Sequence, residues 1–321
     1  MPLWHDDGPI RVGISSCLLG QPVRFDGGHK RDRFLSDELA RYVEWIPVCP
    51  EVEIGMGTPR ETVRLVRGRG ELRMLGTRSR RDWTDAMQSY AKQRVRALER
   101  LELCGYVLKQ GSPSCGMERV EVRDAKGMAR RAGRGLFAEA LLAASPALPV
   151  EEEGRLNDPV LRENWIERVF AYRRLRSLFE AHFSVGRLVA FHAAHELQLL
   201  AHGTEAYRRL GRLVAGAKKL ERAELRLRYQ AGFMAALAVR ATPRRQLNVL
   251  QHCLGYFRDR LDPNTRAALA AQVADYQKGL VPLVVPVTMI RHYVAQLGIE
   301  YLAGQVYLES HPTELMLRNR V

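Results

Sequence analysis

The sequence predicts an α/β N-terminal domain with a mostly parallel sheet, followed by an all-α C-terminal domain. Two observations support this prediction. Strand-like and helix-like segments alternate in the first half of the chain, and helical periodicity alone continues through the second half. At 321 residues the chain is long enough for two domains. We place them at residues 1–150 and 151–321, and residues 143–154, with two prolines and three successive glutamates, form the connection.

Short apolar runs predict the strands of the first domain. They lie at residues 11–19, 46–50 and 105–109, and the first is followed by a glycine and a proline. Apolar residues at helical spacing predict helices at 37–45, 82–103 and 134–142. Because strands alternate with helices, we expect a Rossmann-like arrangement in which the strands run parallel.

Seven segments with helical periodicity predict the helices of the second domain. They cover residues 158–183, 186–202, 205–217, 222–240, 243–260, 263–278 and 281–297. Pro243 and Pro263 lie where two of these helices begin, a position that suits proline. We predict six histidines of the second domain to be hydrogen-bonded core or interface residues, because no carboxylate–histidine pattern completes a metal site around them. They are His192, His195, His202, His252, His292 and His311.

The charge of the chain favours a polyanionic partner. Fifty Lys and Arg residues against 36 Asp and Glu give a formal net charge of +14, which suits nucleic acid, an acidic membrane face or another acidic macromolecule. The apolar run 280–290 contains two prolines and is too short to span a membrane. Asp6 and Asp7 do not fit a secretory signal. We therefore expect a cytoplasmic protein with no membrane partner.

Three of the five cysteines lie at or just after the ends of predicted strands: Cys17, Cys49 and Cys115. Ligands of parallel sheets bind at the carboxyl ends of the strands, and three thiolates meeting there can hold zinc or an iron–sulfur cluster. Three protein ligands would leave one iron of a cluster open to a substrate atom. The spacing also allows Cys17 and Cys49 to be small buried apolar residues. Cys104 and Cys253 lie in apolar surroundings and are predicted core residues.

Five short motifs in the first domain resemble the thiouracil desulfidase family. They are residues 16–20 (SCLLG), 23–27 (VRFDG), 49–52 (CPEV), 58–60 (TPR), and Lys109 together with 112–116 (SPSCG). The second domain is similar to the helical partner domain of the bacterial tRNA 4-thiouridine desulfidases. Its motifs are residues 191–195 (FHAAH), 248–257 (NVLQHCLGYF), 281–286 (VPLVVP) and 311–319 (HPTELMLRN).

The resemblance implies a 4Fe-4S cluster and a set of catalytic residues. The cluster would be held by Cys17, Cys49 and Cys115, with one open iron to accept the sulfur of a thiocarbonyl. The net reaction that the resemblance implies is hydrolysis of the thiocarbonyl group. The family pattern implies Glu51 as the catalytic carboxylate and Ser112 as a second polar catalytic residue. For Ser112 and Ser114, turn chemistry around a proline is the alternative. Asp26 is either a catalytic helper or a structural turn residue.

We predict a tRNA 4-thiouridine desulfidase, because a folded tRNA explains both the positive charge and the additional domain. The candidate RNA contacts are Arg24, Arg78, Arg80, Arg81, Lys109, Arg208, Arg209, Lys218 and Lys219. The sequence leaves the oligomeric state open, and we favour a monomer. The alternatives are a desulfidase of free thiouracil or thionucleosides, a non-catalytic iron–sulfur RNA-binding redox sensor, and a zinc-bound structural module.

Overall fold

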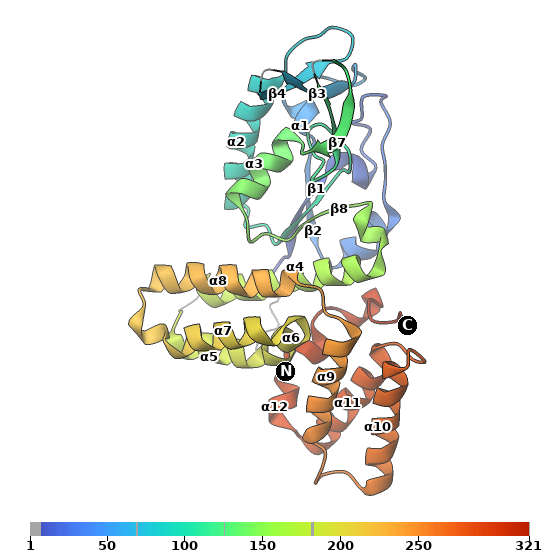
Figure 1. The fold of residues 1–321 in the computed structure, drawn as a ribbon, viewed down its shortest axis with the longest axis vertical. Coiled ribbons are helices and arrows are strands. Elements are labelled where there is room, and N and C mark those ends of the chain that lie inside the picture. Colours follow the sequence, from blue (N-terminus) through green and yellow to red (C-terminus); the bar gives the residue numbers. More distant parts are fainter. Residues whose placement is uncertain (1–7, 69, 125, 181–182, 321) are drawn as a thin grey trace. The chain divides into compact units, whose positions relative to one another are not determined.

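The chain consists of two compact units, the first α/β and the second helical, in agreement with the predicted fold class. The computed structural model describes residues 8–68, 70–124, 126–180 and 183–320. The first unit spans Pro9–Asp158, and the second continues from Pro159 (Figure 1). Among the described residues, no helix is long and apolar enough to cross a membrane.

A four-stranded parallel sheet forms the centre of the first unit. Its strand order is β2 (Glu44–Val48), β1 (Arg11–Ser15), β5 (Gly105–Leu108), β8 (Val150–Glu152), and each strand runs parallel to its neighbours. The central strands are buried on both faces, as parallel strands require. Helices α2 (Thr84–Arg100) and α3 (Leu136–Ala144) lie side by side (Figure 1). Phe137 of α3 contacts Tyr106 of β5, with ring centroids 6.0 Å apart.

A second four-stranded sheet is present in the first unit and was not predicted. Its order is β4 (Glu71–Gly76), β3 (Val63–Gly68), β6 (Val120–Asp124), β7 (Ala129–Gly133). The inner strands β3 and β6 run parallel, and each outer strand is antiparallel to its neighbour. Strand β7 reads ARRAG and has no buried residue. It therefore carries none of the apolar alternation from which strands are predicted.

Three predicted boundaries of the first unit were wrong. The strand at 11–19 ends at Ser15, because the next four residues form a 3-10 turn that Gly20 closes at a φ of 92°. In place of the helix at 37–45 there are a π-helical turn (Phe34–Glu38), a 3-10 turn (Leu39–Arg41) and the start of β2. The stretch 143–154 is more than a connection, because β8 extends the first sheet.

The second unit is built from α-helices. These are α4 (Pro159–Glu180), α5 (Val185–Ala194), α6 (Glu196–His202), α7 (Thr204–Ala215), α8 (Arg222–Ala238), α9 (Pro243–Gly255), α10 (Pro263–Gln277), α11 (Val284–Leu297) and α12 (Glu300–Ala303). The helix predicted at 186–202 is two helices, which meet at His195. Pro243 and Pro263 occupy the first helical turn as predicted, each after an N-cap side chain that accepts a backbone N–H. Cys253 lies in the apolar core of this unit, as predicted.

Four of the six histidines singled out in the second unit are buried and hydrogen bonded, as predicted: His192, His195, His202 and His311. His252 and His292 are exposed and do not belong to the core. His202 Nε2 lies 3.1 Å from Glu167 Oε2, and Gln198 Nε2 donates to Glu167 Oε1 over 2.9 Å. Burial by itself would raise the pKa of Glu167, but its interaction with His202 outweighs this and lowers the pKa. Burial would likewise lower the pKa of His202, but Glu167 raises it overall. The pair is therefore an ion pair inside the helical unit.

Candidate active site

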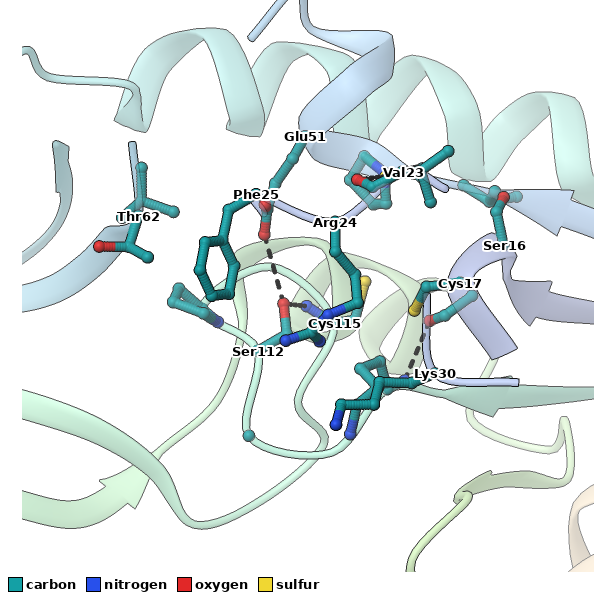
Figure 2. A pocket seen from close by; sticks show the side chains of 18 of the residues that line it. Ser16, Cys17, Val23, Arg24, Phe25, Lys30, Glu51, Thr62, Ser112 and Cys115 are labelled. Atoms are coloured by element: carbon teal, nitrogen blue, oxygen red, sulfur yellow. Dashed lines mark hydrogen bonds between the residues drawn. The ribbon is translucent and has the colours of Figure 1, made fainter. Parts of the chain in front are cut away.

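A pocket of about 390 Å³ lies at the carboxyl ends of three parallel strands (Figure 2). Cys17 follows β1, Cys49 follows β2, and Cys115 lies in the loop that follows β5. All three line this pocket, although they are far apart in the sequence. The alignment of strand ends in a parallel sheet is what brings them together.

Local backbone structure holds the first two cysteines at the pocket. Cys17 lies in the 3-10 turn after β1, where its carbonyl accepts the backbone N–H of Lys30 over 2.9 Å. Cys49 is the N-cap of the short helix α1 (Pro50–Glu53), and its own N–H donates to Glu53 Oε1 over 3.0 Å. Proline at the first helical position fixes where α1 begins and therefore where Cys49 is placed.

The third cysteine is held by the tightly packed loop 110–116. Ser112 Oγ accepts the backbone N–H groups of Ser114 and Cys115, each over 3.2 Å. Gly135 packs against this loop so closely that a Cβ atom there would lie 2.4 Å from the Ser114 carbonyl carbon and oxygen. Any larger residue at position 135 would displace the backbone that carries Cys115.

Burial raises the pKa values of all three thiols above the ordinary value of a cysteine. Burial raises the pKa of Cys17 to about 11, and nearby Lys109 and Arg24 only partly oppose this effect. Burial also raises the pKa of Cys49, and raises that of Cys115 well above its ordinary value. Metal ligation requires thiolates, so loading of a metal into this pocket must release protons.

Glu51 lies in the first turn of α1 and lines the same pocket. Arg60 Nη2 donates to Glu51 Oε2 over 2.6 Å and Arg60 Nε to the same oxygen over 3.1 Å. Ser114 Oγ donates to Glu51 Oε1 over 2.8 Å, and Ser112 Oγ lies 3.4 Å from that oxygen. The ion pair is largely shielded from water, with the side chains of Glu51 and Arg60 only 15% and 6% exposed. The carboxylate therefore has a fixed orientation toward the pocket.

Sequence reasoning did not assign the contacts of Ser114 and Arg60. Ser112 was the predicted polar partner, but the shorter hydrogen bond to Glu51 comes from Ser114, which is fully buried. Arg60 was noted only as part of the TPR motif. The arginine of that motif could have indicated the ion pair, because a buried carboxylate such as Glu51 requires a cation.

Asp26 is not among the residues that line the pocket. Its Oδ1 accepts the Gly28 N–H over 3.1 Å and lies 3.6 Å from Arg24 Nε, while its side chain is 51% exposed. These contacts correspond to the turn alternative of the sequence analysis, and a catalytic role for Asp26 stays a prediction.

Basic residues dominate the charge of the pocket lining. Arg24, Lys30, Arg60 and Lys109 line it, against the single carboxylate of Glu51. Lys109 forms an ion pair with Glu153. Within the described residues, Arg24 Nε is buried and has no hydrogen-bond partner. Beside it Phe25, which also lines the pocket, is 38% exposed and presents an aromatic ring (Figure 2).

The other predicted RNA contacts are exposed and lie outside this pocket. Arg78, Arg80 and Arg81 follow β4, and the guanidinium of Arg81 lies 3.9 Å from the centroid of the Trp83 ring. Arg208, Arg209, Lys218 and Lys219 are exposed on α7 and the turn after it. Their exposure makes them available to a partner, and their role in RNA binding stays a prediction.

The donor set of the pocket fits an iron–sulfur cluster. Among the described residues, no group of three or more His, Cys, Asp or Glu side chains lies close enough to hold one metal ion. A cluster binds each cysteine sulfur through a different iron, so its ligands stand further apart than the ligands of one zinc ion. Three thiols line one pocket of about 390 Å³, and thiols are the donors that iron–sulfur clusters take.

Comparison with known proteins identifies both parts of the chain. The family model for 2-thiouracil desulfurase matches residues 12–153, and that for a protein of unknown function (DUF1722) matches residues 196–312. The chain is 35% identical over 153 residues to the uncharacterized protein YbgA of Escherichia coli (strain K12), covering 47% of this chain and 90% of YbgA. It is 32% identical over 111 residues to the uncharacterized protein YbbK of Bacillus subtilis (strain 168), covering 32% of this chain and 71% of YbbK. A solved structure of the 4Fe-4S-dependent thiouracil desulfidase TudS is 31% identical and matches with a TM-score of 0.38, covering 46% of this chain and 93% of TudS.

Proposed function

The chain belongs to the 2-thiouracil desulfurase family, and we propose that it removes the sulfur of 4-thiouridine in tRNA, converting that nucleoside to uridine. The observation that carries the proposal is the meeting of three cysteines and one oriented carboxylate at a single basic pocket. The cysteines supply the ligands of a metal centre, the carboxylate supplies proton transfer, and the basic lining suits a substrate that carries phosphate.

Cys17, Cys49 and Cys115 are the residues that would hold a 4Fe-4S cluster. When bound, the cluster supplies an open iron that accepts the sulfur of the thiocarbonyl group. No described histidine and no fourth cysteine lines the pocket, so the protein itself offers no further soft ligand for that iron.

Glu51 is the residue that moves protons. Its carboxylate takes a proton from the water that adds to the C=S carbon, and then returns one to the ring nitrogen or to the departing sulfur. The C–S bond breaks and a C=O bond replaces it, so water and thiouridine give uridine and hydrogen sulfide with no oxidant or reductant. Arg60 and Ser114 hold both carboxylate oxygens, which keeps the reactive group aligned during the two transfers.

The basic lining supports a polynucleotide substrate over a free base. A free thiouracil carries no phosphate, whereas Arg24 and Lys30 offer positive charge next to the exposed ring of Phe25. An aromatic ring beside cationic groups suits a displaced nucleobase and its flanking phosphates. The net charge of +14 supports the same substrate class, because phosphate contacts supply most of the sequence-independent affinity for RNA.

Anaerobic incubation of the cluster-loaded protein with 4-thiouridine-containing tRNA tests the proposal. Digestion to nucleosides should show loss of 4-thiouridine and an equal gain of uridine. Free 4-thiouracil, assayed in parallel at the same concentration, should react more slowly. Faster turnover of the free base would favour the small-molecule desulfidase, and a cluster-loaded protein that converts neither substrate would refute desulfidase function.

A further inference from the structure

A second pocket, of about 170 Å³, lies entirely within the helical unit. Helices α4, α11 and α12 and the residues that follow α12 form it, and its apolar walls include Val294, Leu302, Val306 and Leu308. Pockets for drug-sized ligands commonly measure ~300–1,000 Å³. This pocket therefore suits a molecule of only a few heavy atoms.

The basic residue Arg174 of α4 lines the pocket and is only 8% exposed. Its Nε lies 3.4 Å from His195 Nε2, and its Nη1 donates to the Ser310 carbonyl over 3.2 Å. Nη2 is buried and has no hydrogen-bond partner among the described residues. Burial lowers the pKa of Arg174 to about 10, so the guanidinium still carries its charge near neutral pH.

The acidic groups that act on Arg174 or line its pocket are engaged elsewhere. Glu167, the carboxylate that acts electrostatically on Arg174, is paired with His202 over 3.1 Å. Glu309 lines the pocket, and its Oε1 lies 3.0 Å from Arg291 Nη2 at the same pocket. Within the described part of the chain, no ion pair reaches Arg174. A buried cation without a counter-charge is costly, and a bound anion would remove that cost.

We propose that this pocket binds a small organic carboxylate, whose charge neutralises Arg174 and whose short aliphatic part packs on the apolar walls. Inorganic phosphate would also neutralise the charge of Arg174. It would, however, place a strongly hydrated ion against Val294, Leu302 and Val306 and leave their surface without an apolar partner. This inference concerns the helical unit alone and does not depend on the desulfidase function.

Isobutyrate is the probe for this proposal, and isobutyramide, which has the same shape without the charge, is its matched control. Each is titrated against the full-length protein during thermal unfolding, with inorganic phosphate as a third ligand. At ten times its Kd, isobutyrate should raise the Tm of the helical unit by roughly 3–5 °C. Isobutyramide and phosphate should leave the Tm close to its starting value.

Two substitutions of exposed alanines locate the site. Ala295 of α11 lines the pocket, so A295Y should fill it and abolish the isobutyrate shift, while A268Y on α10 should preserve the shift. R174M should abolish the shift in Tm as well. If R174M does not fold, A295Y alone tests whether isobutyrate binds in this pocket. Equal shifts with isobutyrate and isobutyramide, a shift that survives A295Y, or no shift with isobutyrate would overturn the proposal. A larger shift with phosphate would exclude the organic carboxylate.

Discussion

Replacement of Glu51 by glutamine separates the chemistry of the carboxylate from its place in the structure. The amide keeps the size of the side chain, and its carbonyl can still accept the 2.8 Å hydrogen bond from Ser114. It cannot take a proton from water. Loss of a positioned acid–base group costs typically ~10²–10⁴-fold in rate, so Glu51→Gln should lower single-turnover desulfuration by about that factor.

The substitution also leaves Arg60 without a counter-charge at a site where its side chain is 6% exposed. Breaking a buried ion pair costs about 3–5 kcal/mol. Arg60 Nη1 still donates to the carbonyls of Val23 and Gly57, over 3.0 and 2.9 Å, so the loss in free energy of unfolding should fall toward the lower end of that range. The variant should therefore fold and load iron, and chemical denaturation measures the remaining stability.

Glu53→Gln is the matched control, because Glu53 lies on the same short helix but is not among the residues that line the pocket. Its carboxylate accepts the Cys49 N–H over 3.0 Å and the Tyr90 hydroxyl over 2.7 Å, and lies 3.4 Å from Arg94 Nε. Rates are compared at equal iron content per chain. A Glu51→Gln rate within tenfold of the wild-type rate would refute the role given to the carboxylate. So would an equal loss in an iron-loaded Glu53→Gln protein.

Three further outcomes are expected. Ser114→Ala removes a hydrogen bond to a charged group, worth about 1.5–3 kcal/mol, so single-turnover rates should fall roughly ten- to a hundredfold at unchanged iron content. The raised pKa of His202 contributes stability that is complete below its unfolded value of ~6.5 and is lost as pH rises through its folded value, by ~1.4 kcal/mol per pKa unit. The free energy of unfolding of the wild type, measured in urea, should therefore fall above neutral pH. His202→Gln should show no such decline. Charge removal at Arg208 and Arg209 should weaken tRNA binding in filter-binding titrations. It should also flatten the dependence of binding on salt, by about one unit of the log–log slope for each phosphate that is no longer neutralised. Arg228→Gln, which removes a side chain already ion-paired with a glutamate, should change neither the affinity nor the slope.

The positions of the three cysteines could be predicted, because they depend only on regular structure. Cys17 and Cys49 directly follow apolar runs, and parallel pairing of β1, β2 and β5 forces the ends of these strands to one edge of the sheet. The helices of the second unit could be predicted for a similar reason, since a repeated apolar face is visible in the sequence alone. Their breaks were less visible, as the interruption at His195 shows.

The contacts within the pocket could not be predicted, because they depend on loops whose paths are set by tertiary packing. Ser114 reaches Glu51 only because the loop 110–116 is folded against Gly135. Arg60 lies in an irregular segment, and the pattern around it does not specify which carboxylate it meets. In the second sheet only the edge strand β7 lacks an apolar signal, since it buries no side chain, whereas β6 alternates two buried valines with an exposed glutamate and carries a signal that our strand prediction did not use.

Arg60 connects parts of the pocket that the sequence keeps apart. Its Nη1 donates to the Val23 carbonyl, and the same carbonyl oxygen lies 3.8 Å from Cys49 Sγ, while Nη2 and Nε hold the carboxylate of Glu51. One guanidinium thus fixes the loop before Phe25 relative to both Cys49 and Glu51. Only a planar group with several fixed donors can make these contacts together, which a lysine ammonium cannot reproduce. This arrangement couples the position of the Glu51 carboxylate to that of Cys49, so the proposed proton carrier keeps its place relative to the proposed cluster ligand.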